Sequence, residues 1–118
     1  MRERFLKLSA VGALFALTLF LAACPPQKSI AELQRDPQRY SNKEVIVRGT
    51  VVESIGAMGA GMFEIDDGTG RLWVYTERYG VPAKGLRVGV VGIVTPTFSF
   101  AGRSFATVMR ETQGRKYE

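Results

Sequence analysis

The chain has 118 residues, which is enough for one domain of ordinary size and too few for two. Hydrophobic residues make up 46% of it and charged residues 23%, so wholesale disorder is excluded. There is no His and only one Cys, which excludes an intrachain disulfide and removes the most common general base. The net charge is +5, but three basic residues lie among the first seven, and the remainder is too weakly basic to indicate nucleic-acid binding by itself.

The first 23 residues have the composition of a secretory signal peptide. Arg2, Arg4 and Lys7 form a short basic start, and an apolar run of 14 residues follows from Leu8 to Leu21. As a helix this run would be about 21 Å long, short of the roughly 30 Å hydrocarbon core that a membrane-spanning helix crosses. We therefore expect residues 1–23 to be a cleaved signal peptide.

The apolar run ends in Leu21-Ala22-Ala23-Cys24, which resembles the lipobox of bacterial lipoproteins. The resemblance implies a diacylglyceryl group on the Cys24 thiol, cleavage before Cys24 and acylation of the new amine. Two or three acyl chains anchor a protein firmly, whereas one holds it only marginally. The implied location is the bacterial cell envelope, facing the periplasm or the exterior, and Pro25 in place of Asp favours the outer membrane. The alternative is an ordinary cleavage site with an incidental Cys.

Residues 24–42 are predicted to form the lipidated tether and one short helix. Ser29-Ile30-Ala31-Glu32 has the spacing of a capping box, and Leu33 continues the apolar face that Ile30 begins. The helix is expected to end at Asp36, because the residue before a Pro is displaced from the helical region.

After this helix the pattern is β throughout. Short runs rich in Val, Ile and aromatic residues alternate with polar residues, and Gly, Pro and Asp separate them. The polar residues 113–118 are expected to be a loose tail. The predicted strands cover residues 44–55, 62–66, 71–76, 85–95 and 104–110.

Three of these stretches, residues 42–51, 63–70 and 85–92, resemble small bacterial OB-fold domains, both of the nucleic-acid-binding type and secreted. The resemblance implies an all-β fold, a small five-stranded OB-fold-like barrel over residues 43–112, preceded by the short N-terminal helix. It departs from the fuller pattern at residues 77–84, where a Gly/Pro connector replaces a helix. The N-terminal helix is then expected to plug the barrel end. A fold of this type does not identify a ligand.

No group of residues indicates catalysis. The stretch 66–70, Asp-Asp-Gly-Thr-Gly, lacks the closing Glu of a calcium loop and is expected to be a tight turn. Residues 56–61 are Gly-rich but lack the Lys-Ser/Thr of a phosphate-binding loop. Without His, no Ser/His or Cys/His pair can form. We expect no enzyme activity, no metal and no cofactor apart from the covalent lipid on Cys24.

Aromatic residues supply the remaining candidate site. If Leu72 and Val74 face the core, Trp73 and Tyr75 face outward, because strand side chains alternate. The hairpin between the last two strands lies beside this face in OB folds. The candidate ligand-binding residues are Arg71, Trp73, Tyr75, Phe98, Phe100 and Arg103.

Three uses of these aromatic residues remain open. They pack beneath the N-terminal helix or the tether, bind an extended peptide or protein partner of the envelope, or stack on single-stranded nucleic acid or an oligosaccharide. Acidic Glu64 and Asp66 beside Arg71, together with the envelope location, disfavour nucleic acid. The leading hypothesis is a lipid-anchored, non-enzymatic binding module for a protein or peptide, and the alternative is a binder of nucleic acid or oligosaccharide.

Overall fold

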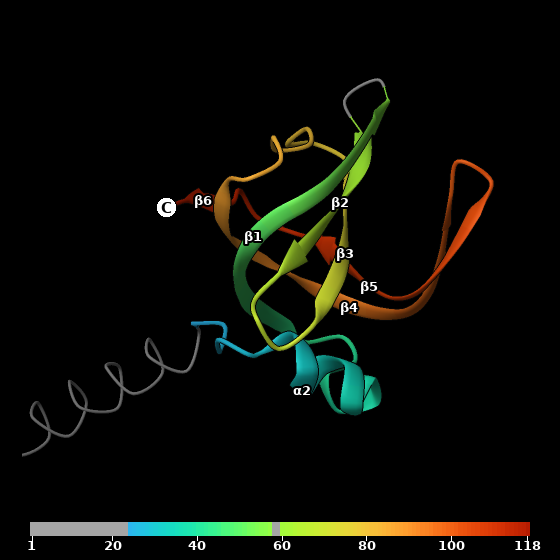
Figure 1. Ribbon diagram of the computed structural model, residues 1–118. Coiled ribbons are helices and arrows are strands. Elements are labelled where there is room, and N and C mark those ends of the chain that lie inside the picture. The colour runs from blue at the N-terminus through green and yellow to red at the C-terminus, as the bar shows by residue number, and fades with distance from the viewer. Residues whose placement is uncertain (1–23, 58–59) are drawn as a thin grey trace, which may run out of the picture.

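The computed structural model describes residues 24–57 and 60–118, so the predicted signal peptide lies outside the described residues (Figure 1). Two short helices, α2 (Ile30–Arg35) and the 3-10 helix η1 (Pro37–Tyr40), come first. Neither these nor any other helix in the described ranges is long and apolar enough to cross a membrane. The strands are β1 (Glu44–Ala57), β2 (Ala60–Asp66), β3 (Arg71–Thr76), β4 (Arg87–Phe100), β5 (Arg103–Glu111) and the two-residue β6 (Lys116–Tyr117).

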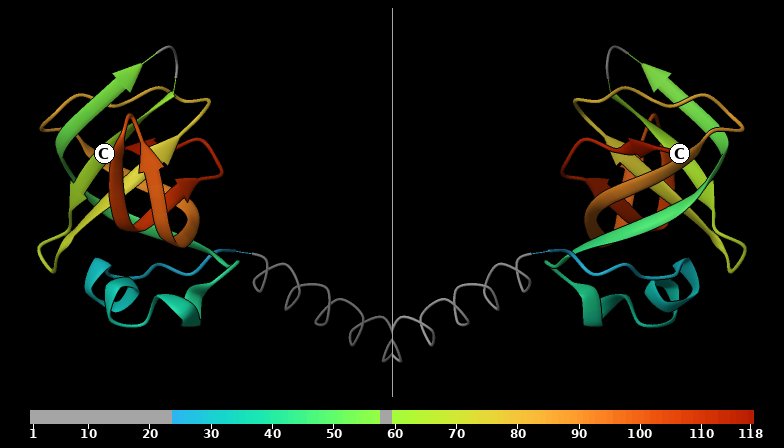
Figure 2. Two further views of the ribbon diagram at one scale, coloured as in Figure 1. Left: turned by 90° about the vertical axis from the view of Figure 1, so that its right-hand side faces the viewer. Right: turned by 90° about the vertical axis from the view of Figure 1, so that its left-hand side faces the viewer.

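The five long strands close into a ring, which confirms the predicted all-β barrel. Hydrogen-bonded neighbours follow the order β1–β2–β3–β5–β4, and β4 pairs with β1 to complete the circle. All these pairings are antiparallel except β3–β5, which is parallel and joins Trp73–Tyr75 to Val108–Arg110. Figure 2 shows the ring from two sides, with the N-terminal helices beneath it. Closure leaves few free strand edges.

The long strand β1 pairs with two neighbouring strands, and Gly49 lies near the residue at which its pairing changes from β4 to β2. Residues before it pair with β4, and residues from Thr50 onward pair with β2. A Cβ atom at Gly49 would lie 2.8 Å from the carbonyl oxygen of Asp66, closer than real side chains come to backbone. The backbones of β1 and β2 therefore approach closely here, as a glycine in the middle of a strand often indicates.

Apolar side chains from every long strand, most of them aliphatic, fill the barrel, and α2 closes one end of it. On β1 the alternation predicted from sequence is observed, since Val45, Val47 and Val51 are buried. Ile30 and Leu33 of α2 are completely buried in the same cluster, so the helix plugs the barrel as expected. The connector between β3 and β4 contains no helix and packs Val81 against this core.

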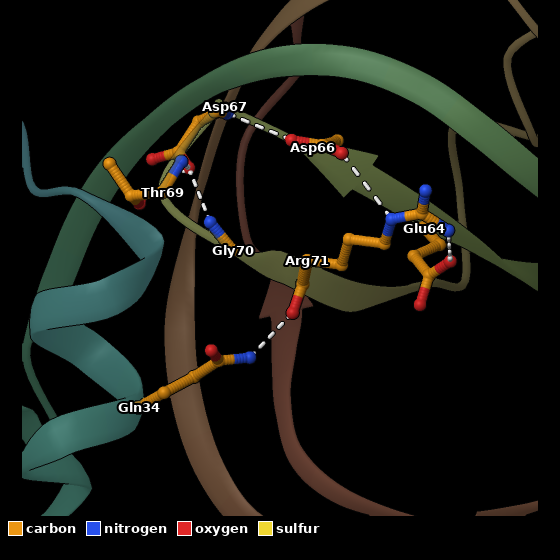
Figure 3. Close-up of polar contacts among 8 residues, drawn as sticks. Gln34, Glu64, Asp66, Asp67, Thr69, Gly70 and Arg71 are labelled. Carbon is orange, nitrogen blue, oxygen red and sulfur yellow. Dashed lines mark hydrogen bonds and ion pairs between the residues drawn. The ribbon is translucent and has the colours of Figure 1, made fainter.

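The turn between β2 and β3 fastens α2 to the barrel (Figure 3). The Asp67 carboxylate accepts hydrogen bonds within its own turn from the backbone N–H groups of Thr69 (2.9 Å) and Gly70 (3.2 Å). Its other oxygen accepts from the first N–H of the helix, at Ile30, over 2.9 Å. Ser29 caps the same helix by accepting from the N–H of Glu32 over 3.2 Å. The predicted tight turn and helix cap are both present, and the turn also satisfies the helix N-terminus.

The C-terminal segment 113–118 differs from the expected loose tail. Strand β6 pairs with the edge of β4, and the backbone N–H of Glu118 donates to Arg87 over 2.9 Å. Arg115 forms a buried ion pair with Glu111, with 2.6 Å between Nη2 and Oε1 and side chains that are 2% and 0% exposed. The charged residues make this segment look like a solvated tail in the sequence. They are ordered in the structure because they are paired, and a charge can be buried when it has a partner.

Candidate functional site

The outer face of β3 carries the predicted aromatic residues. Leu72 and Val74 are buried in the barrel core, and Trp73 and Tyr75 point to the other side, where they are half-buried. The predicted direction of this strand is therefore confirmed.

The hairpin beside this face is longer than expected. Strands β4 and β5 continue to Phe100 and Arg103, so only Ala101 and Gly102 form the turn, in place of the whole segment 97–103. Both turn residues have positive φ, 52° and 77°, as the tightest two-residue hairpin turns require. The hairpin extends beyond the closed ring, as Figure 1 shows at the orange end of β4.

A break in the alternation of β4 and β5 directs the hairpin onto β3. Val94 and Met109 pair with each other and lie in the barrel core. Phe98 and Phe105 pair four residues further along each strand and lie outside the core. Between these pairs stand Pro96, which has no N–H, and Thr107, whose φ is 51°. A positive φ is strained for a β-branched residue, and here it turns the face of the hairpin from the core to the outside of β3.

Five aromatic rings meet in the space between β3 and the hairpin, and we call them the aromatic cluster. The centroids of Trp73 and Phe105 are 5.0 Å apart, and those of Tyr75 and Phe98 are 4.5 Å apart. Tyr75 also lies 5.8 Å from Phe100. Fully buried Met62 and Val108 form the floor. The cluster consists of Trp73, Tyr75, Phe98, Phe100 and Phe105.

Phe105 is the member that sequence reasoning missed. Strict alternation along the predicted strand 104–110 puts it on the same face as Met109, inside the barrel. The strained backbone at Thr107 separates the two faces, and a positive φ at a Thr has no sequence signature. Its cross-strand partner Phe98 was among the predicted residues, so an aromatic pair across a hairpin is the signal that was available.

Packing of Trp73 and Tyr75 beneath the N-terminal helix or the tether, one of the three expectations, is wrong, because their apolar neighbours come from β2, β4 and β5. Ile30, Leu33 and Tyr40 belong to the barrel-core cluster, which is separate from the aromatic cluster. The helix is held at the barrel end by the β2–β3 turn, so it does not reach the outer face of β3.

Two arginines flank the aromatic cluster but face different surroundings. The Arg103 guanidinium lies 5.7 Å from the Trp73 ring centroid and 5.1 Å from that of Phe105, within the range of cation–π attraction. Arg71 instead contacts acidic neighbours, with its Nε 3.3 Å from Asp66 Oδ2 and its Nη1 3.9 Å from Glu64 Oε1 (Figure 3). Of the two predicted cations, Arg103 belongs to the aromatic cluster and Arg71 to a mixed-charge surface beside it.

The phenol of Tyr75 is a hydrogen-bond donor at the edge of the cluster. Desolvation and the negative charge of Glu77 raise the pKa of Tyr75 above its ordinary value of 10.0. The group therefore remains protonated at neutral pH and presents a polar edge on an apolar ring.

The lipidation candidate, Cys24, lies at the N-terminal end of the described chain, far in sequence from the aromatic cluster. Cys24 is the first described residue and its side chain is exposed. Two residues later the carbonyl of Pro26 accepts a hydrogen bond from the N–H of Ile46 over 2.9 Å, and Lys28 N–H donates to Ile46 over 2.9 Å. The tether is thus fixed to β1 almost from its first residue. Within the described ranges, no three His, Cys, Asp or Glu residues are grouped as metal ligands would be.

No protein-family model and no curated protein matches the chain. Among solved structures, it is similar to a chain of the S. pombe Stn1–Ten1 complex, with 16% identity over 64% of this chain and a TM-score of 0.48. The match spans 57% of that chain, little more than half of its length. It is also similar to the OBody AM3L09, solved bound to hen egg-white lysozyme, with 18% identity, a TM-score of 0.51, and coverage of 67% of this chain and 84% of that one.

At these identities a likeness shows the fold alone. The OBody match and the closed ring of five strands together define the class of this protein as an OB-fold-like β-barrel.

Proposed function

We propose that this protein is a lipid-anchored, non-enzymatic binding module of the bacterial cell envelope, which holds a protein or peptide partner at its aromatic cluster. The anchor is the acylated Cys24, and the domain faces the periplasm or the exterior, with the outer membrane favoured by Pro25. The partner contacts Trp73, Tyr75, Phe98, Phe100 and Arg103, and Arg71 contributes from the neighbouring surface.

The observation that carries the binding proposal is that five aromatic rings gather outside a core that is already closed. The barrel is filled by mostly aliphatic side chains and the Phe63 ring and is plugged by α2, and none of the five cluster rings belongs to this core. Four of the rings remain half-buried, and Arg103 lies exposed above two of them. Trp, Tyr and Arg are the side chains that most often dominate binding energy at protein interfaces.

The charges beside the cluster favour a peptide over nucleic acid. Glu64 and Asp66 offset Arg71, so Arg103 is the one predicted cation of the site without a nearby carboxylate in the described contacts. A binder of single-stranded nucleic acid needs a continuous basic groove along its stacking platform. Rings with a polar Tyr edge and a single cation suit an extended peptide with apolar side chains and an acidic group.

The lipid anchor is tested by replacing the acylated thiol. In cells, Cys24→Ala is expected to abolish incorporation of labelled fatty acid and to leave the uncleaved precursor, read by gel mobility and intact mass. Ser29→Ala nearby removes a helix cap and leaves the lipobox intact, so it should be processed normally. Normal cleavage and release of Cys24→Ala would show that the site is an ordinary cleavage site.

The binding surface is tested by photo-crosslinking in the cells that make the protein. We place p-benzoylphenylalanine at Phe100, in the half-buried rim of the cluster, and at Leu86 as the control. Leu86 is 42% exposed and lies outside the cluster. The expected result is one discrete adduct from position 100 and none from position 86.

Enzyme digestion then identifies the chemistry of the adduct. Sensitivity to protease but not to nuclease or glycosidase supports a protein partner. An adduct removed by nuclease or glycosidase would support the alternative of nucleic acid or an oligosaccharide. Equal crosslinking from positions 100 and 86 would mean that the aromatic cluster is not the binding surface.

A further inference from the structure

A hollow of about 640 Å³ lies next to Cys24 and is unlike the aromatic cluster in its chemistry. Three basic side chains line it, from the tether, from η1 and from the residue just before β1: Lys28, Arg39 and Lys43. The one acidic residue in its lining, Glu44, accepts a hydrogen bond from Gln113 over 2.7 Å. The excess of positive charge is therefore concentrated around the Cys24 side chain.

The neighbouring hollow makes this concentration clearer. It shares Arg39 and adds Arg35, but Glu32 and Asp36 in its lining balance the two cations. The lining of this second hollow is thus near neutral, whereas the lining of the hollow at Cys24 holds three cations and one acidic residue.

The tether holds this positive surface close to Cys24. The carbonyl of Pro26 and the N–H of Lys28 are both hydrogen-bonded to Ile46 on β1. The free chain from Cys24 to Pro26 is two residues, which reach at most about 7 Å. Lys28 is further oriented by the Tyr40 ring, whose centroid is 5.7 Å from its Nζ. Acyl chains on Cys24 would therefore bring the three cations to the headgroup layer of the bilayer.

We propose that the surface formed by Lys28, Arg39 and Lys43 docks on an anionic phospholipid bilayer, and so fixes the orientation of the barrel on the membrane. This inference rests on the proposed lipid anchor. Each Lys or Arg at an anionic membrane surface contributes about fivefold to the affinity, and the effect reaches only about 8 Å at physiological salt. The short tether and the hollow that the three cations share with Cys24 hold them near the anchor.

The experiment uses the acylated protein, purified in detergent and reconstituted into vesicles of phosphatidylglycerol or of phosphatidylcholine. A water-soluble amine-acylating reagent and mass spectrometry measure the modification rate of each lysine. The internal control is Lys84, which lies on the β3–β4 connector and pairs with Glu53 of β1. The expected result is that Lys28 and Lys43 react roughly fivefold or more slowly in phosphatidylglycerol than in phosphatidylcholine, while Lys84 does not change.

Salt and a charge variant sharpen the test. In 1 M salt, where the Debye length is about 3 Å, the slowing should disappear. Arg39→Gln leaves both reporter lysines in place and should weaken the slowing several-fold, whereas Arg78→Gln, which removes a cation from another surface, should leave it intact.

Two failures are distinguishable. If the intact mass shows no acyl chains on Cys24, the anchor and the docking inference are both overturned. If the protein is acylated but Lys28 and Lys43 react equally fast in both lipids, the docking inference alone is overturned.

Discussion

The barrel core and the aromatic cluster are built from the same strands but in different ways. The core is mostly aliphatic, with Val47, Val74 and Val90 fully buried, and Phe63 is its one fully buried ring in the described residues. The cluster is aromatic, its rings are mostly half-buried, and it lies against the barrel at Met62 of β2, at β3 and at Val108 of β5. One side of each strand is covered because the ring closes, and the other side of β3 is covered only because the hairpin bends back.

This difference shows which part of the molecule can change without loss of the fold. The core unites elements from the whole described chain, so it can open only by global unfolding. The cluster depends on one hairpin beyond Pro96 and Thr107, and regions with few links to the main core open locally at lower free energy. A surface that must admit a partner is expected in the second kind of region.

The largest expected effect is on the barrel, at its buried ion pair. Arg115→Ala leaves the Glu111 carboxylate buried without its cation, and also removes the 2.7 Å hydrogen bond from Arg115 to the Gly80 carbonyl. The free energy of unfolding should fall by about 3 to 5 kcal/mol. Arg48→Ala, which breaks an exposed pair with Glu118, should cost less than about 1 kcal/mol. Equal effects in urea denaturation would contradict the burial of the first pair.

The second expected effect is at the close approach of β1 to the end of β2. Gly49→Ala places a Cβ atom 2.8 Å from the Asp66 carbonyl, so the backbone has to move, and we expect a loss of about 1 to 3 kcal/mol. Gly89→Ala is the matched control, since its nearest contact would be a side-chain atom 3.7 Å away. Melting temperatures compare the two variants, and an unchanged value for Gly49→Ala would argue against closure of the barrel here.

The aromatic cluster should respond locally. Trp73→Ala removes a half-buried ring that packs 5.0 Å from Phe105, and we expect it to lower the free energy of unfolding by about 1 to 2 kcal/mol. Hydrogen exchange should become faster in residues 97–106 but not in β1. Tyr79→Ala, at a 41% exposed ring elsewhere, should leave both measurements unchanged. Faster exchange spread evenly over the barrel would show that core and cluster form a single cooperative unit.

The smallest effect is the pH dependence contributed by the turn that holds α2. Burial by itself raises the pKa of Asp67, but the hydrogen bonds from Thr69, Ile30 and Gly70 outweigh it and hold the pKa below the ordinary 3.8. A carboxylate with a lowered pKa stabilises the fold above its ordinary pKa, and the contribution is lost as pH falls through the folded-state value.

Asp67→Asn should therefore cost about 0.5 to 1 kcal/mol at neutral pH and flatten the loss of stability that the wild type shows below about pH 4. Asp36→Asn, at an exposed position after α2, should keep the wild-type acid profile. A wild-type acid profile in Asp67→Asn would mean that the turn does not hold the helix through its charge.

Much of the barrel could be predicted from local patterns. Alternation assigned the inward face of β3, the capping box placed the start of α2, and the Asp-Gly-Thr-Gly turn was found from its residue types. These features depend on neighbours within a few residues, whose geometry is set by backbone sterics and local hydrogen bonds. The lipobox resemblance at Cys24 is equally local, and it stays a prediction.

The tertiary structure alone decided the length and direction of the β4–β5 hairpin, the place of Phe105 and the burial of the tail. Thr107 adopts a strained φ only because packing on both sides compensates for it, and nothing in its neighbours in sequence signals that balance. Arg115 looks like a solvated charge until Glu111 and the Phe63 ring, 4.7 Å from its guanidinium, surround it. Sequence by itself determined which residues have to leave water and in what repeating order along each strand. Which of the two faces of a strand is covered by other residues depends on contacts between segments that are distant in the sequence. These contacts outweigh the loss of chain entropy only after the ring has closed.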